Sequence, residues 1–320
     1  MNPAELAIRL RGLHNSGALD LPLPGGGSTG ERLHRLARIA SCDVSLARLA
    51  EAHTDAVAIL AEAGSRAAPN ALYGVWAAED SDRRLDVRET DGGIVLEGGL
   101  PFCSGVGLID RALVHARCGS ERWLVDVDLS ADGIVADLGV WQAPTFAATC
   151  TGATYFNDVA LPNDTRVGGD GWYLSRSGFW QGACGPAACW AGGAQGLVRI
   201  ALAEGAARSA DPHRLAHLGA LAALDWQLSA MLDAAGAEID ATANDASAAE
   251  RIAGALRVNV ERAATAVIDH LGRAFGPRLL AFDGEVARRV AEVQLYVRQH
   301  GGERDLARLG QLACQLAGTT

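Results

Sequence analysis

Apolar residues near the start of the chain recur at the spacing of a helix. Leu6, Leu10 and Leu13 lie three or four positions apart, which places them on one helical face. After a Pro/Gly-rich loop, a longer run from Glu31 to Ala63 repeats this pattern. We therefore expect residues 1–70 to form a short helical N-terminal domain.

The middle of the chain consists of short apolar runs that turn residues separate. Asp91-Gly92-Gly93 tolerates positive φ, as a hairpin turn requires, and a loop with Phe102-Cys103-Ser104-Gly105 is expected to follow the hairpin. This spacing predicts an antiparallel β-barrel or sandwich domain over residues 71–168. The expected strands are Tyr73–Ala77, Asp86–Glu89, Ile94–Glu97, Ala112–Ala116, Trp123–Asp128 and Thr154–Leu161.

From about residue 178 the helical pattern returns in four long segments. Pro212 follows Asp211 as an N1 proline follows its cap, and Gly276 with the proline after it ends the third segment. Short connections between long helices predict an up-down four-helix bundle over residues 169–320. The fold class is α+β, with several domains. The four segments are Pro186–Ser209, Pro212–Ala243, Ser247–Phe275 and Gly284–Leu316.

Composition excludes several classes of function. The formal charge of −10 argues against binding of a nucleic-acid backbone, which needs clustered cations. All 28 basic residues are arginines, so Schiff-base catalysis, a pyridoxal-phosphate anchor and a P-loop lysine are excluded. The seven cysteines show no CxxC pair, which is typical of reduced thiols.

No segment predicts secretion or a membrane span. The N-terminus is amphipathic without an apolar core of the signal-peptide kind. The most apolar window, Pro186–Ala203, contains Gln195 and Arg199 and is rich in Gly and Ala, so a buried helix is expected there. We therefore expect a cytoplasmic protein that has no membrane span and does not bind nucleic acid.

Few motifs point to metal or nucleotide chemistry. His213 and His217 are spaced i, i+4 and could share a metal on one helix face. A third ligand at suitable spacing is missing from the sequence, so we interpret them as solvated or capping residues. GxSxG is absent, and no GxGxxG follows a strand.

Three local motifs, together with the order of domains, resemble the acyl-CoA dehydrogenase superfamily of FAD-dependent enzymes. The chain is identified as a divergent and shortened member. The motifs are Gly74-Val75-Trp76-Ala77-Ala78-Glu79-Asp80-Ser81-Asp82, Gly98-Gly99-Leu100-Pro101-Phe102-Cys103-Ser104, and Tyr155-Phe156-Asn157-Asp158-Val159-Ala160-Leu161-Pro162.

The resemblance implies that the β domain faces the flavin ring of FAD. Phe102 would lie where a tryptophan of the family flanks the ring, and Cys103 would belong to the same flavin-facing edge. Ser104 would offer its hydroxyl near N5 and O4 of the flavin. The stretch that contains Trp76, Ala78 and Ser81 would face the pyrimidine edge.

The resemblance also implies contacts from the bundle to the FAD of a neighbouring subunit. Arg208 matches an arginine near the pyrophosphate, and Arg273 and Gly276 occupy the place of a Gln-x-x-Gly motif. An arginine can bind phosphate bidentately. A homodimer or homotetramer is therefore expected.

The carboxylate base of the family is missing from its usual stretch near Tyr296. Matching the glycines puts His300 at the position of the base, whereas counting from Arg289 puts Arg298 there. His300 can serve as a general base near neutral pH, and Glu303 is a further candidate.

These features predict a flavin-dependent oxidoreductase that removes hydrogen from the α and β carbons of an acyl thioester or a related small molecule. The first alternative is a two-component flavin monooxygenase of the same fold, in which a histidine near the reacting position is typical. The second is a non-catalytic paralogue that acts as an assembly partner, because the expected carboxylate is lost.

Overall fold

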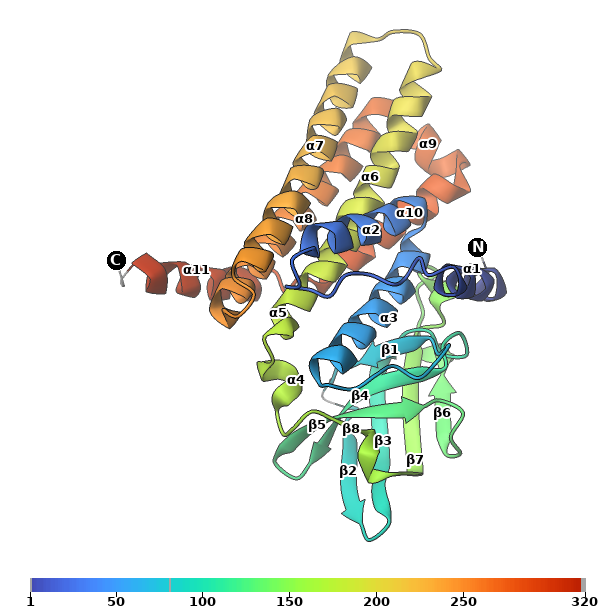
Figure 1. Ribbon diagram of the computed structural model, residues 1–320. Helices are drawn as coiled ribbons and strands as arrows, with labels where there is room; N and C mark the ends of the chain where they lie inside the picture. The colour runs from blue at the N-terminus through green and yellow to red at the C-terminus, as the bar shows by residue number, and fades with distance from the viewer. Residues whose placement is uncertain (1, 81, 318–320) are drawn as a thin grey trace. The chain divides into compact units, whose positions relative to one another are not determined.

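The computed structural model describes residues 2–80 and 82–317. Its contacts divide the chain into two compact units (Figure 1). Unit 1 contains the chain up to Leu21 and Leu49–Phe179, and unit 2 contains Pro22–Arg48 and the chain from Trp180 onward.

Unit 1 is built around a sheet that includes every strand expected from the sequence. The described residues form eight strands in the order β6-β7-β3-β2-β4-β5-β8, with β1 paired to β4. Two of the pairings, β1 with β4 and β2 with β4, are parallel, so the sheet is mixed and not antiparallel throughout as predicted. The strands are β1 (Tyr73–Trp76), β2 (Leu85–Thr90), β3 (Gly93–Cys103), β4 (Arg111–Cys118), β5 (Glu121–Asp128), β6 (Ile134–Asp137), β7 (Gly152–Leu161) and β8 (Arg166–Val167).

Helices and short turns complete unit 1. The helix α3 belongs to unit 2 as far as Arg48 and to unit 1 from Leu49. These elements are α1 (Pro3–Asn15), α3 (Val44–Glu62), α4 (Trp172–Ser175) and the 3-10 turns η1 (Leu138–Val140), η2 (Ala147–Thr149) and η3 (Asn163–Thr165). The short helix α5 (Gly178–Gly182) begins in unit 1 and continues into unit 2 from Trp180.

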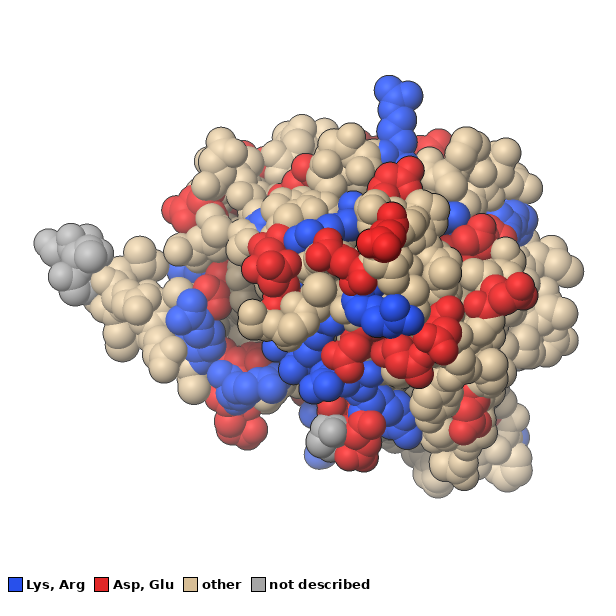
Figure 2. All heavy atoms as spheres, turned by 90° about the horizontal axis from the view of Figure 1, so that it is seen from below, with Lys and Arg blue, Asp and Glu red and all other residues tan. Residues whose placement is uncertain are grey.

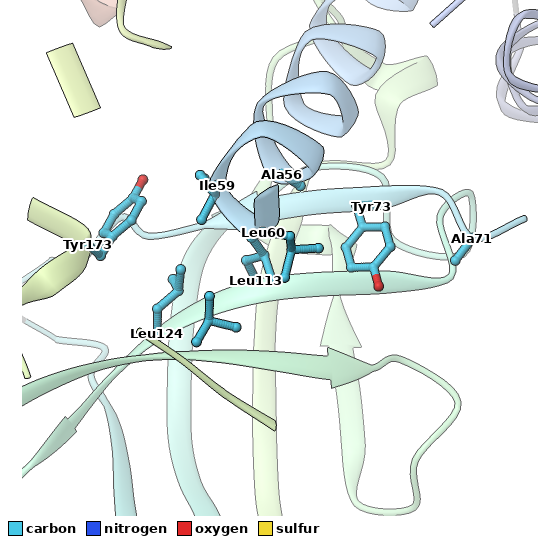
Figure 3. Close-up of a cluster of buried hydrophobic side chains, with 9 residues drawn as sticks. Ala56, Ile59, Leu60, Ala71, Tyr73, Leu113, Leu124 and Tyr173 are labelled. Carbon is cyan, nitrogen blue, oxygen red and sulfur yellow. The ribbon is translucent and has the colours of Figure 1, made fainter. Parts of the chain in front are cut away.

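The core of unit 1 lies between α3 and one face of the sheet. Ile59 and Leu60 on α3 pack against Leu113 of β4 and Leu124 of β5, and all four side chains are almost fully buried (Figure 3). Tyr73 on β1 joins the same cluster. Burial of each such aliphatic side chain contributes roughly 1.5–3 kcal/mol, so this contact fixes α3 on the sheet.

The predicted hairpin is present, but the second strand is longer than expected. β2 and β3 pair from Leu85 with Gly98 to Thr90 with Gly93, which leaves Asp91 and Gly92 as the turn. β3 then continues to Cys103 because β7 pairs with it along this stretch. The prediction of a loop at Phe102 and Cys103 was wrong, since that loop begins at Ser104.

Unit 2 is helical, and α6, α7 and α8 run side by side in it (Figure 1). The prediction of a single fourth helix over Gly284–Leu316 was wrong. The helix ends at Tyr296, and a 3-10 turn and a Gly301-Gly302 pair precede the next helix. The elements are α2 (Thr29–Cys42), α6 (Cys184–Ala206), α7 (Pro212–Ala241), α8 (Ala246–Phe275), α9 (Pro277–Phe282), α10 (Gly284–Tyr296), η4 (Val297–Gln299) and α11 (Glu303–Ala317).

The helix α2 packs on α6 and α7 within unit 2. Asp240 on α7 accepts hydrogen bonds from the backbone N–H groups of Gly27 (3.0 Å) and Thr29 (2.9 Å). A side chain from another helix thus supplies the N-terminal cap of α2. A Cβ atom added at Gly236 would lie 2.4 Å from the Cα of Gly30, so the backbones of α2 and α7 approach too closely for a larger residue.

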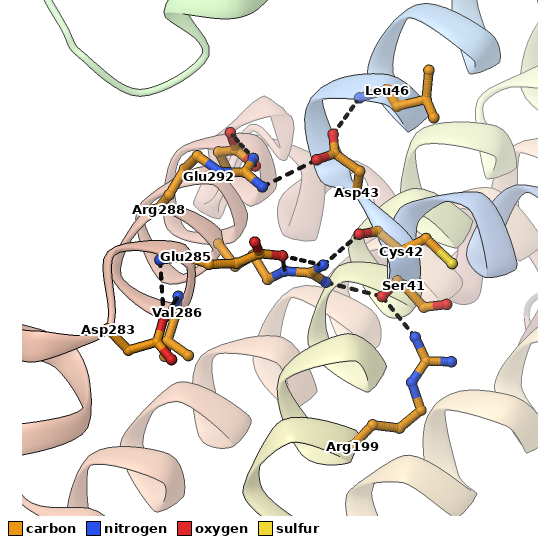
Figure 4. Close-up of polar contacts among 11 residues, drawn as sticks. Ser41, Cys42, Asp43, Leu46, Arg199, Asp283, Glu285, Val286, Arg288 and Glu292 are labelled. Carbon is orange, nitrogen blue, oxygen red and sulfur yellow. Dashed lines mark hydrogen bonds and ion pairs between the residues drawn. The ribbon is translucent and has the colours of Figure 1, made fainter. Parts of the chain in front are cut away.

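Two arginines bind the C-terminal carbonyl groups of α2 (Figure 4). Arg199 donates to the carbonyl oxygen of Ser41 at 2.7 Å, and Arg289 donates to the same oxygen at 3.0 Å and also to Cys42. Cations favour this end of the helix dipole. Asp43 follows and accepts from the N–H of Leu46 at 2.8 Å, so it caps α3 and divides the predicted run 31–63 into two helices.

The surface carries charges of both signs. Arginine and carboxylate side chains are intermixed over the face in Figure 2. Arg83 pairs with Asp80 at 2.8 Å, and Arg84 pairs with Asp86 at 3.0 Å. Among the described residues, no helix is both long and apolar enough to span a membrane.

A buried histidine of α3 makes the stability of unit 1 depend on pH. The Nδ1 of His53 accepts the N–H of Tyr73 at 3.2 Å, and burial lowers the pKa of His53 from 6.5 to about 4. Between these values the unfolded chain binds a proton that the folded chain does not, so stability falls as pH decreases. We expect a loss of about 3 kcal/mol between pH 7 and pH 4 from this group, measured by urea unfolding. His53→Gln, which keeps an acceptor, should reduce this slope, and an unchanged slope would contradict the assignment.

Candidate functional site

Phe102 is an exposed aromatic residue in a strained backbone conformation. Its side chain is 59% exposed, and its φ is 56°. The register of β3 against β7 shifts between Leu100 and Cys103, which is where Phe102 lies. A left-handed conformation costs a residue with a side chain roughly 1–2 kcal/mol. The surrounding sheet therefore imposes this conformation and turns the ring outward.

Cys103 points the opposite way from Phe102. Its side chain is fully buried, and its thiol donates to the carbonyl oxygen of Leu100 at 3.5 Å. Burial raises the pKa of the Cys103 thiol to about 12, so the group stays protonated near neutral pH. A surface ligand would meet only the backbone of Cys103.

Ser104 begins a chain of three hydroxyl groups whose direction can be determined. Thr149 donates to the carbonyl oxygen of Phe146 at 2.8 Å. A hydroxyl has one hydrogen, so in the 2.8 Å contact between Thr149 and Thr151 the donor is Thr151. In the 2.9 Å contact between Thr151 and Ser104 the donor is then Ser104. The half-buried Ser104 hydroxyl directs its hydrogen inward and can serve a ligand as an acceptor.

Trp76 fixes the backbone of the same loop. The indole of Trp76 is buried, and its N–H donates to the carbonyl oxygen of Ser104 at 3.0 Å. Trp76 therefore positions Ser104 from beneath. Ala78 is exposed on the segment that follows β1, and Ser81 lies outside the described residues.

Glu79 anchors that segment through a charged cluster that the sequence motifs did not reveal. It accepts hydrogen bonds from Arg117 and Arg122 and lies 3.3 Å from Nδ1 of the buried His115. The hydrogen bond from Arg117 lowers the pKa of Glu79, and burial lowers that of His115. Among the residues that the structure describes, none forms a hydrogen bond with the buried Nε2 atom of His115. Glu79 thus holds residues 76–80 against β4.

The predicted phosphate-binding residues lie at one end of unit 2. Arg208 donates to Glu204 at 2.9 Å, and its guanidinium carbon lies 5.4 Å from the centre of the Phe275 ring. The structure thus brings Arg208 to the end of α8, where Gly276 has a φ of 64°. Arg273 donates to Asp269 at 2.7 Å.

His300 lies in the break between η4 and α11. Its Nδ1 accepts the N–H of Gly302 at 3.3 Å, and its Nε2 lies 4.0 Å from Asp305. Burial lowers the pKa of His300, which favours the neutral ring. Because Nδ1 accepts a hydrogen bond, the neutral ring carries its hydrogen on Nε2. Arg298 donates to Glu261 at 2.7 Å, and Glu303 is exposed at the start of α11.

No protein-family model and no curated protein sequence matches the chain. Solved structures do match over most of its length. KijD3 in complex with FMN and a dTDP-linked amino-keto sugar has a TM-score of 0.85 at 17% identity, over 100% of this chain and 88% of that one. TdsC from a Paenibacillus species, with FMN and indole, has a TM-score of 0.82 at 18% identity, over 96% and 94%. The methanesulfinate monooxygenase MsuC from Pseudomonas fluorescens has 0.78 at 18%, over 99% and 97%.

Identity at this level shows the fold alone. The chain shares its fold with KijD3, TdsC and MsuC, two of which were solved with FMN. The assignments of individual site residues stay predictions.

The strain at Phe102 can be measured by comparing two substitutions that both remove the ring. Because glycine adopts positive φ without cost, we expect Phe102→Gly to be more stable than Phe102→Ala by about 1 kcal/mol. At the exposed strand residue Arg88, the matched pair should have the opposite order, with Arg88→Ala the more stable. Urea unfolding measures both differences. The same order at both positions would contradict the proposed strain.

Proposed function

We propose that the protein is a flavin-dependent oxidoreductase whose flavin ring lies against Phe102 and Ser104. The observation that carries this proposal is the exposed Phe102 ring, held in a strained conformation beside a half-buried hydroxyl. An aromatic face and a directed polar group suit a flat ring with polar edge atoms. Proteins of the same fold that were solved with FMN support this class of cofactor.

The direction of the hydroxyl chain fits a flavin in a specific way. Ser104 directs its hydrogen to Thr151 and offers its oxygen as an acceptor. The reduced flavin has an N–H group at N5, where the oxidised form has a lone pair. Ser104 therefore favours the reduced form if it lies near N5, as the sequence resemblance implies.

We favour FMN as the flavin, although the sequence resemblance implied FAD. FAD would need a binding surface for a second phosphate and an adenosine. Of the predicted pyrophosphate contacts, Arg208 pairs with Glu204 near the end of α6, and Arg273 pairs with Asp269 on α8. Two proteins of this fold hold FMN. We also propose that the protein forms a homodimer or homotetramer. We further propose domain boundaries at residues 70 and 168.

For the reaction, we favour oxygenation of a small molecule over dehydrogenation of an acyl thioester. A bound flavin would supply the electrons that reduce dioxygen. Abstraction of an α proton needs a free base, but Nδ1 of His300 is occupied by the N–H of Gly302. Neutral His300 can then only donate a hydrogen bond from Nε2, which suits orientation of an oxygen atom. MsuC is a methanesulfinate monooxygenase and TdsC is a dibenzothiophene monooxygenase.

A reduction experiment tests the proposed function. Purified protein should bind added FMN, and anaerobic bleaching should occur with a flavin reductase and NADH but not with acyl-CoA. Phe102→Gly should weaken FMN binding by about fivefold, because the loss of an aromatic stacking partner costs about 1 kcal/mol. Asp158→Gly, a second exposed residue with positive φ, is the control that should bind normally.

Each other outcome favours a different function. Bleaching by acyl-CoA would restore the dehydrogenase, with His300 as its base. Failure to bind FMN or FAD at any concentration would exclude both flavoenzymes and leave the non-catalytic paralogue.

The hydroxyl chain predicts how the flavin potential responds to a substitution that does not touch the flavin. Thr151→Val removes the acceptor for Ser104, whose hydrogen can then bind oxidised N5. We expect the two-electron potential to become more negative by about 20 mV, equivalent to one hydrogen bond of about 1 kcal/mol. Redox titration of the FMN-loaded variant measures this. A more positive potential would contradict the assigned direction of the hydrogen bond between Ser104 and Thr151. The Ser104→Ala variant, which lacks the hydroxyl, serves as the reference for the potential.

A further inference from the structure

Two histidines from different helices of unit 2 face each other at close range. His217 on α7 and His270 on α8 have their Nδ1 atoms 3.0 Å apart and their ring centres 5.3 Å apart. Both side chains are half-buried. From the sequence we interpreted His213 and His217 as solvated or capping residues, whereas the structure pairs His217 with a residue 53 positions away.

This distance limits the protonation states that the pair can adopt. A direct hydrogen bond between the two Nδ1 atoms needs a hydrogen on one atom and a lone pair on the other. When both imidazoles are neutral with their hydrogens on Nε2, two lone pairs point toward one small volume. Two neutral imidazoles arranged in this way are the ligands that Zn²⁺, Ni²⁺ and Cu²⁺ prefer.

The packing of α7 against α8 holds the two rings in place. Leu218, next to His217, and Leu271, next to His270, are both buried in unit 2. Their burial fixes the backbone that carries each histidine. Rigid supporting elements reduce the cost of ordering metal ligands. Small adjustments of the two rings would let both nitrogens reach one ion.

We propose that His217 and His270 form a binding site for a borderline divalent metal ion of the Zn²⁺ or Ni²⁺ class, which links α7 to α8. Among the described residues, no group of three or more His, Cys, Asp and Glu side chains could hold a metal. The ion therefore keeps water at its remaining positions. The site is independent of the proposed flavin chemistry, since none of its ligands was placed near the flavin.

Equilibrium dialysis and thermal unfolding of the untagged full-length chain test this proposal. With Ni²⁺ as the probe, the chain should bind one equivalent. Its melting temperature should rise with Ni²⁺ concentration, because the ion binds the folded form. His217→Gln and His270→Gln should each weaken binding by more than about tenfold, since loss of even an outer partner costs that much.

His213→Gln is the matched control, one helical turn away on α7 and exposed. It should bind Ni²⁺ as the unchanged chain does. The proposal is overturned if the unchanged chain binds no Ni²⁺, or if binding survives in both the His217→Gln and His270→Gln variants. If one of these variants fails to fold, the other decides the result.

Discussion

The break in register between β3 and β7 is the constraint on which the candidate site depends. β3 pairs with β2 from Gly93 to Gly98 and with β7 on its other side as far as Cys103. The irregularity falls between Leu100 and Cys103, and it sends the thiol of Cys103 into the core and the ring of Phe102 to the surface. A regular strand at this point would not account for the exposure of the Phe102 ring. Backbone strain of this kind concentrates at functional sites.

Polar side chains then fix what the sheet presents. Trp76 holds the Ser104 carbonyl group from below, and Thr151 takes the Ser104 hydrogen. The two interactions fix the Ser104 carbonyl group and direct its hydroxyl hydrogen toward Thr151. A polar network in a protein interior is rigid only when each member has a partner, and this chain ends on the carbonyl oxygen of Phe146. The loop is therefore organised before any ligand binds.

Most helices and the strands could be predicted because local patterns determine them. Apolar spacing placed α1, and alternating runs separated by Asp and Gly placed the strands. What failed depended on contacts distant in sequence. Pairing with β7 extended β3 through Phe102, and parallel pairing with β4 made the sheet mixed. Likewise, no local pattern indicates that Thr151 would bind Ser104, or that Asp240 would cap α2.

The structure of the protein with FMN tests the central claim most directly. The account predicts that the isoalloxazine ring lies against the Phe102 side chain, with a flavin nitrogen within hydrogen-bonding distance of the Ser104 oxygen. The Ser104 and Trp76 positions should be unchanged, because both are fixed before binding. A flavin bound elsewhere on the chain, or a Phe102 ring without contact to it, would contradict the account.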